Sequence, residues 1–336
     1  MNVFKYRGGD LEIFERDLFA LEHNYFWGAK IDDLNDPCEA LILSDKINQQ
    51  LDALKFIVGK KKEGSLKEVK EAFLKVIETN KKLGVYSLSK TYKDELLWAH
   101  YAYSHFGFCI EFDLEILKGG YRNKLLSFDV KYKNEPPEIN IGDISSRAKE
   151  IFNKLVGFKS KRWEYEEEYR IITDFSGEYF YPPNAVKSIY FGVRTTEKNK
   201  EKIKEVLRGR GIKFYQIIQK EKSYKFDCKL IEDSLEENTT YLRKFDFGDF
   251  EIEMELYDTK YADLIKRGDI VIKINKILNK SEIEDLSNYL REQLFFKSER
   301  LLIQIYQKDQ KDDMFNWANA NYLNGKWNIS INEFVL

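Results

Sequence analysis

The chain has 336 residues, of which 43% are hydrophobic and 15% aromatic, so it can bury one large core or two ordinary ones. Its 5 proline and 18 glycine residues are too few for a long flexible linker or a low-complexity arm. A formal net charge of −2 points to no class of partner by itself.

The positions of the cysteines indicate the redox state of the cellular compartment in which the protein is found. Cys38, Cys109 and Cys228 are far apart and form no Cys-x-x-Cys pair, which argues against a disulfide framework or a zinc site and favours a reducing compartment. The first ten residues lack the apolar stretch of a signal peptide. No segment approaches the roughly 18–20 apolar residues that a membrane span needs. We therefore expect a cytoplasmic protein with no membrane partner.

Predicted strands and helices alternate over the first 230 residues. Apolar patterning predicts strands near residues 3–6, 85–89, 106–113, 126–131, 164–174, 187–192 and 212–218. Helical spacing predicts helices within residues 11–27, 65–83, 93–105, 143–156 and 196–208. The first of these ranges closes with the aromatic run Tyr25–Trp27. Ser65 and Glu68 form a capping box at the start of the second of these helices.

A polar, acidic stretch at residues 232–240 predicts a domain boundary. Residues 1–230 carry a net charge of about +5 and residues 231–336 about −7, which sum to the −2 of the chain. Beyond the boundary we expect strands at 241–257, 301–306 and 327–331, and helices at 313–322 and at 281–294, the latter with a Ser281–Glu284 capping box.

These elements predict an α+β fold. Residues 1–230 should form a twisted mixed or antiparallel sheet with flanking helices, and residues 231–336 a smaller α/β domain. The second domain holds no catalytic constellation, so we expect it to bind a partner or to make a homo-oligomer.

The segment Trp163–Arg170 is the richest in candidate site residues. If it is a strand, its side chains alternate in direction, and Glu166, Glu168 and Arg170 share one face about 7 Å apart along the chain. Two carboxylates beside an arginine are costly unless a site uses them. A solvated sheet face with ion pairs across strands is the equally weighted alternative.

The predicted first domain contains three further groups of candidate site residues. Ser87 and Ser89 point the same way from one predicted strand. The predicted helix that follows carries His100, Tyr101 and His105, and a hydrogen-bonded packing role is the simpler interpretation of each histidine. Lys5 and Arg7 share a face of the first strand and suit an anion clamp, although exposed basic residues are common. The stretch 35–39 reads as a rigid Asx-Pro turn from which Asp36 or Glu39 could reach a site.

Several common motifs are missing. The chain has no Walker A loop, no Gly-x-Gly-x-x-Gly after a strand and no His-Glu-x-x-His.

The residues that are present resemble the bacterial family called domain of unknown function 2971, over residues 1 to about 220. The matching pieces, in order, are Lys5–Arg7, Trp27–Glu39, Ser87–Ser89, Leu97–Ala102, His105–Phe112, Trp163–Arg170 and Ile189–Gly192, with Cys38 where the family often has phenylalanine.

A second resemblance is to ADP-ribosyltransferases of the Arg–Ser–Glu type. These enzymes place an arginine on the first strand, a Ser-x-Ser on a following strand and a Glu-x-Glu on a late strand. This chain has Arg7, then Ser87-x-Ser89, then Glu166-x-Glu168. The resemblance implies a split-sheet core that binds NAD as a substrate, with no metal, and the company such enzymes keep suggests a toxin or phage-defence effector.

The roles implied by this resemblance follow the chemistry of each side chain. Arg7 pairs with the pyrophosphate, and Ser87 or Ser89 holds the nicotinamide ribose. Glu168 stabilises the oxocarbenium-like transition state, and Glu166 orients a protein or nucleic-acid acceptor. The remaining candidates are Ser89 and His100 as catalytic residues and Lys5, Tyr92, Trp98, Tyr101 and Arg170 as cofactor-binding residues.

Two alternatives stay open. The carboxylates Glu166, Glu168, Asp36 and Glu39 could instead bind Mg²⁺ in a nuclease or other phosphodiester hydrolase. The domain could also bind a nucleotide or a protein without catalysis. The transferase hypothesis predicts that Arg7, Ser87 or Ser89, and Glu168 converge on one cleft.

Overall fold

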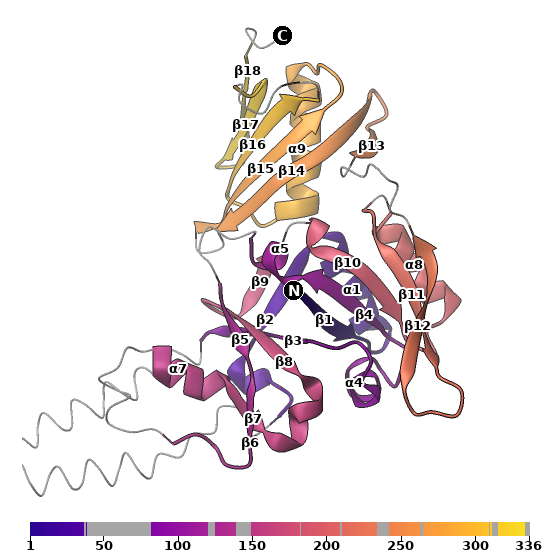
Figure 1. Cartoon of the computed structure of the whole chain (residues 1–336). Coiled ribbons are helices and arrows are strands. Elements are labelled where there is room, and N and C mark those ends of the chain that lie inside the picture. Colours follow the sequence, from indigo (N-terminus) through magenta and orange to yellow (C-terminus); the bar gives the residue numbers. More distant parts are fainter. Residues whose placement is uncertain are drawn as a thin grey trace, which may run out of the picture. The chain divides into compact units, whose positions relative to one another are not determined.

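A computed structural model of the chain is shown in Figure 1. It describes residues 1–36, 38, 82–119, 125–138, 149–181, 183–208, 210–233, 242–262, 265–308, 310 and 315–332. Contacts between backbone positions divide the chain into two compact units, each built from separate stretches. The first comprises Met1–Phe26, Tyr92–Lys124 and Tyr179–Leu336, and the second comprises Trp27–Thr91 and Leu125–Glu178.

The first unit contains a run of paired strands that begins at the N-terminus. In spatial order these are β1 (Asn2–Arg7), β4 (Phe108–Asp113), β10 (Val186–Phe191), β11 (Lys213–Gln219) and β12 (Phe226–Asp233). Neighbouring strands are antiparallel except β10 and β11, which are parallel. These strands confirm most of the apolar patterns read from the sequence of the predicted first domain.

Helices cover both faces of these strands. Helix α1 (Leu11–Glu22) begins at the N-cap Asp10 and places Phe14 edge-on to Phe108, while α4 (Glu95–Tyr101) places Trp98 edge-on to Tyr6. Phe108 and Tyr6 occupy neighbouring positions of the β1–β4 register, so their side chains point to opposite faces. Helices α5 (Leu114–Gly119) and α8 (Glu197–Val206) complete this part, together with the short turn η4 (Pro183–Ala185).

A strained turn follows α4. Tyr103, Ser104 and His105 all have positive φ, at 49°, 50° and 71°, a conformation that L residues rarely adopt. The turn is packed tightly by Gly107, where a Cβ would lie 2.0 Å from the Arg7 carbonyl oxygen, and by Gly192, where a Cβ would lie 2.2 Å from the His105 carbonyl oxygen. The helix predicted for residues 93–105 is therefore shorter than expected, because these close approaches impose another backbone path.

A second sheet of the first unit contains the C-terminal part of the chain. Its strands are, in order, β13 (Leu242–Asp246), β14 (Glu251–Ala262), β15 (Arg267–Ile274), β16 (Arg300–Gln307), β17 (Ala318–Leu323) and β18 (Lys326–Ile331). β15 and β16 are parallel and joined by α9 (Lys280–Phe295), which lies beside the sheet (Figure 1). Apolar residues of α9, Ile283, Leu286, Leu290 and Leu294, belong to the same buried core as residues of these strands. The burial of β15, a strand not predicted from the sequence, alternates with a period of two residues.

The second unit is built around four strands. β3 (Gly84–Ser89) pairs with β2 (Tyr25–Lys30) and with β8 (Glu168–Thr173), and β8 pairs with β5 (Leu126–Asp129). A separate two-stranded ribbon joins β6 (Lys131–Lys133) to β7 (Phe158–Ser160) beside α7 (Lys149–Val156). Among the described residues this unit also contains the short helices η1 (Ile31–Asp33) and η3 (Lys161–Glu166) and the strand β9 (Gly177–Phe180). β2 and β9 each contribute residues to both units.

The observed elements confirm the α+β class and correct several details. The helix predicted at 313–322 is wrong, since Ala318–Leu323 is strand β17. Helix α1 ends at Glu22 and the aromatic run after it is strand β2, while the capping box of α9 is Asn279–Glu282 rather than Ser281–Glu284. The predicted helix at 65–83, with its Ser65–Glu68 box, lies outside the described residues apart from its last two positions.

The boundary predicted near residue 230 stays a prediction. β12 ends at Asp233 in one sheet and β13 begins at Leu242 in another, whereas the compact units have different limits. Among the described residues, no helix is long and apolar enough to cross a membrane.

Candidate functional site

The Glu-x-Glu segment enters the site from two different elements. Lys161–Glu166 forms the 3-10 helix η3, Glu167 adopts a left-handed conformation with φ 43°, and strand β8 starts only at Glu168. The predicted strand over residues 164–167 is therefore wrong. The alternation argument holds for Glu168 and Arg170, which do share a face of β8, but Glu166 reaches the same place from η3.

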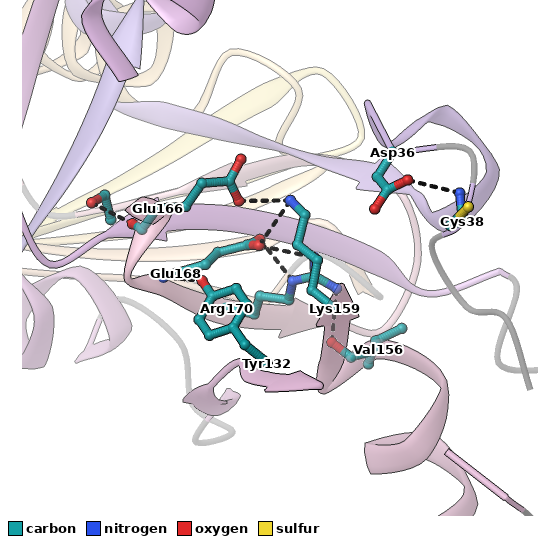
Figure 2. Close-up of polar contacts among 9 residues, drawn as sticks. Asp36, Cys38, Tyr132, Val156, Lys159, Glu166, Glu168 and Arg170 are labelled. Atoms are coloured by element: carbon teal, nitrogen blue, oxygen red, sulfur yellow. Dashed lines mark hydrogen bonds and ion pairs between the residues drawn. The ribbon is translucent and has the colours of Figure 1, made fainter. Parts of the chain in front are cut away.

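Glu168 and Arg170 form a two-pronged ion pair. Arg170 Nε lies 2.7 Å from Glu168 Oε1 and Nη2 lies 3.0 Å from Oε2, while Nη1 donates to the Val156 carbonyl at 2.8 Å (Figure 2). Arg170 is fully buried and Glu168 is 4% exposed. A planar guanidinium with all three nitrogens engaged is held in one orientation, so it also fixes the carboxylate.

Lys159 joins the two glutamates. Its Nζ lies 2.6 Å from Glu166 Oε2 and 3.3 Å from Glu168 Oε2, as Figure 2 shows, and 4.8 Å from the centre of the Trp163 ring. Glu166 is 3% exposed. We name Lys159, Glu166, Glu168 and Arg170 the charge cluster. Its two positive and two negative groups balance, which is the condition under which buried charges are tolerated.

Hydroxyl groups from neighbouring strands complete the surroundings. In the β3–β8 register Ser87 lies opposite Arg170 and Ser89 opposite Glu168. Ser87 hydrogen-bonds the Glu168 carboxylate, and Ser89 Oγ donates to the Glu166 carbonyl at 2.7 Å. The predicted serine and glutamate motifs are thus brought together, although Ser89 touches the backbone of η3 and not a carboxylate.

The electrostatics keep Glu168 ionised. Burial alone raises its pKa, but the positive charges of Arg170 and Lys159 and the hydrogen bonds from Arg170 and Ser87 outweigh burial and lower the pKa from 4.5 to about 2. The Glu168 backbone N–H donates to Tyr132 Oη at 2.8 Å. Burial raises the pKa of Tyr132, so this hydroxyl stays protonated at neutral pH.

The remaining predicted site residues of the first unit have other surroundings. Trp98 is buried and its Nε1 donates to the Tyr92 carbonyl at 2.7 Å, which gives it a packing role. The Tyr92 ring stacks on Tyr190 with centroids 4.2 Å apart, so one face of this ring is already covered. His100 is exposed, and its ring lies edge-on to Tyr101 at 6.3 Å.

The predicted anion clamp also belongs to the first unit. Lys5 and Arg7 lie on one face of β1, as the alternation predicts, and both are partly exposed. Arg7 Nη1 lies 3.7 Å from Oδ1 of Asp17, a buried α1 carboxylate that also contacts Arg16. The expected convergence of Arg7 with Glu168 stays a prediction.

The Asx-Pro segment forms a turn as expected where it is described. The Cys38 backbone N–H donates to Asp36 Oδ1 at 2.9 Å (Figure 2). Pro37 and Glu39 lie outside the described residues. Within the described part of the chain, no group of three or more His, Cys, Asp or Glu side chains is arranged to hold a metal ion.

Two groups of polar residues were missed from the sequence. The first group is Lys159, which belongs to the charge cluster, and Tyr132, which contacts the Glu168 backbone. A lysine four residues before Trp163 offered only a weak signal in the sequence. In the first unit, Glu111 is buried and accepts from Asn2 Nδ2 at 2.6 Å and from Tyr190 Oη at 2.9 Å. A glutamate among Phe108–Phe112 was the signal for this second site, because a carboxylate in an apolar strand needs donors.

Comparisons with known proteins add one finding about the family. No curated protein and no solved structure is similar enough to the chain to count as a match. Residues 97–171, which include β4 and the whole charge cluster, match the model of a family described as protein of unknown function (DUF2971). This match supports the family resemblance read from the motifs over the segment that carries Glu166, Glu168 and Arg170.

Proposed function

We propose that this chain is an ADP-ribosyltransferase-like enzyme that consumes NAD, with Glu168 as its central carboxylate. One observation carries the proposal: strand β3 lies beside β8 in a register that sets Ser87 and Ser89 opposite Arg170 and Glu168. The serine pair and the glutamate thereby come from adjacent strands, which supports the convergence on one cleft that the transferase hypothesis predicts.

The charge state of Glu168 suits this role. A carboxylate with a pKa of about 2 is ionised at every physiological pH and can stabilise positive charge that develops on a ribose ring. In the reaction, the bond between ribose C1′ and nicotinamide breaks and nicotinamide leaves as a neutral molecule. A nucleophile of the acceptor then bonds to C1′ and loses its proton.

Access to Glu168 requires one local change. The carboxylate is 4% exposed, and its oxygens already contact Arg170, Lys159 and Ser87. Arg170 and Ser87 belong to the strand pair itself, whereas Lys159 comes from the separate β6–β7 ribbon at 3.3 Å. Withdrawal of the Lys159 ammonium opens one side of Glu168 Oε2 to a ribose hydroxyl, while Arg170 keeps its contacts with both carboxylate oxygens.

The alternatives receive less support from the described residues. Glu166 and Glu168 are both paired with cations, and a carboxylate in such a pair is a poor ligand for Mg²⁺. We extend the proposal to a macromolecular acceptor, protein or nucleic acid, and to a cytoplasmic toxin or phage-defence role. Arg7 and Lys5 serve as the pyrophosphate clamp in this proposal.

The test is incubation of the full chain with labelled NAD and a cell lysate, followed by measurement of label transfer and of free nicotinamide. We expect both to depend on the chain and to fall by at least about 100-fold in Glu168→Gln, since loss of one electrostatic stabiliser costs about that much. Arg7→Ala should raise the KM for NAD, because Arg7 is proposed to bind its pyrophosphate.

Glu164→Gln is the matched control, because Glu164 is an exposed carboxylate on η3. It should leave both readouts unchanged. Thermal unfolding of each variant separates loss of chemistry from loss of fold. Absence of both transfer and nicotinamide release in the wild-type chain refutes the proposal, and cleavage of DNA or RNA that needs Mg²⁺ and is lost in Glu166→Gln supports the nuclease instead.

A further inference from the structure

We propose that two copies of the chain associate through strand β18, edge to edge and antiparallel, with Ile329 of one copy opposite Ile329 of the other. The proposal is independent of the transferase activity. β18 is the last strand of the second sheet, and it pairs with β17 on one side. Within the described residues no strand pairs with its other side.

The unpaired side of β18 presents backbone groups in a regular pattern. The Asn332 N–H donates to the Trp317 carbonyl at 2.8 Å, so the residue at this position directs its backbone groups toward β17. In an antiparallel ladder, successive residues direct these groups alternately to the two sides. Trp327, Ile329 and Ile331 therefore direct N–H and C=O outward, where a further strand can pair with them.

The side chains of β18 are complementary to a second copy of themselves. With Ile329 at the centre, Trp327 lies opposite Ile331, and Asn328 lies opposite Ser330. Apolar residues thus meet apolar residues on the face toward α9, and neutral polar residues meet on the other face. The single charge of the strand, Lys326, lies opposite Asn332, so no like charges face each other.

The exposure of β18 fits such a partner. Trp327, Ile329 and Ile331 pack against the core of the sheet but stay partly exposed, and the Trp327 ring is held by donation from Nε1 to Asn288 Oδ1 at 2.7 Å. Natural edge strands usually carry charges, proline or a bulge that discourage pairing. β18 has no proline, an unbroken register with β17 and a charge only at its first residue.

The test uses a substitution that removes a backbone hydrogen-bond donor from the open side of β18 only. Ile329→Pro removes an outward N–H but no hydrogen bond to β17, whereas Ile329→Val keeps the N–H and the branched shape. Light scattering during gel filtration of the full chain, at about 5–100 μM, should show a concentration-dependent dimer for the wild type and for Ile329→Val. Ile329→Pro should remain monomeric with an unchanged thermal unfolding temperature.

Disulfide trapping gives a second measurement in case the proline variant does not fold. Opposed residues of a hydrogen-bonded pair have Cα atoms about 5.5 Å apart, within the range that a disulfide bridges. In a Cys38→Ser background, which removes the exposed native thiol, Ile329→Cys should form a covalent dimer under mild oxidation and Ser330→Cys should form much less. A wild-type chain that stays monomeric at about 100 μM, or equal trapping at both positions, overturns the proposal.

Discussion

Arg170 and Glu168 lie two residues apart on the same face of β8, and the guanidinium contacts both carboxylate oxygens at 2.7 and 3.0 Å. Arginine and glutamate side chains are mostly exposed in folded proteins, yet here both are buried. A buried pair contributes little net stability by its formation, but the loss of one member leaves an uncompensated charge. We therefore expect the free energy of unfolding to depend on mutation of either residue and on the protonation of Glu168.

Arg170→Met should lower the free energy of unfolding by about 3–5 kcal/mol, because Glu168 then stays buried without its main cation. Urea denaturation at neutral pH measures this loss. Arg162→Met, an exposed position on η3, is the control and should change stability by less than about 0.5 kcal/mol. A loss below about 1 kcal/mol for Arg170→Met would show that the carboxylate has other sufficient partners.

Acid should weaken the fold through Glu168. Its folded pKa of about 2 lies below the ordinary value of 4.5, so its contribution to stability is present above pH 4.5 and is lost as the pH falls toward 2. Unfolding free energies measured from pH 7 to pH 2.5 should therefore decline more steeply for the wild type than for Glu168→Gln. A Glu164→Gln chain should keep the wild-type slope, and equal slopes in all three would exclude Glu168 as the cause.

Arg210 holds the end of helix α1. Its Nη1 donates to the Leu21 carbonyl at 3.0 Å and to Asn24 Oδ1 at 2.7 Å, and its Nη2 donates to the Glu22 carbonyl at 2.9 Å. Arg210→Met leaves these buried acceptors without donors and should cost about 2–3 kcal/mol of unfolding free energy. The exposed neighbour Arg208 provides the matched Met variant, which should unfold at the wild-type denaturant concentration.

Relief of the strained turn after α4 should stabilise the protein. Ser104 has φ 50°, which glycine adopts without the steric cost that a Cβ imposes. Ser104→Gly should raise the unfolding free energy by about 0.5–1 kcal/mol in thermal or urea denaturation. Ser104→Ala retains a Cβ and should bring no gain, so an equal gain in both variants would point to the lost hydroxyl and not to the backbone.

The sequence alone determined the α+β class, most strands of the first unit and the shared face of Glu168 and Arg170. These features depend on local patterns: apolar residues with a period of two or 3.6, and side chains that alternate along a strand. The helix predicted at 313–322 failed because its alanines favour a helix locally, whereas pairing with β16 and the Asn324–Gly325 hairpin turn impose a strand.

Only the tertiary structure decided the composition of the charge cluster and the open edge of β18. Lys159 comes from another ribbon and Glu166 from a short helix, and a left-handed Glu167 turns the chain from this helix into β8. No local pattern encodes such a meeting, since it depends on long-range packing and on the balance of buried charge. The same holds for β18, whose sequence predicts a strand but whose place at the end of the sheet follows from the order of strand pairing.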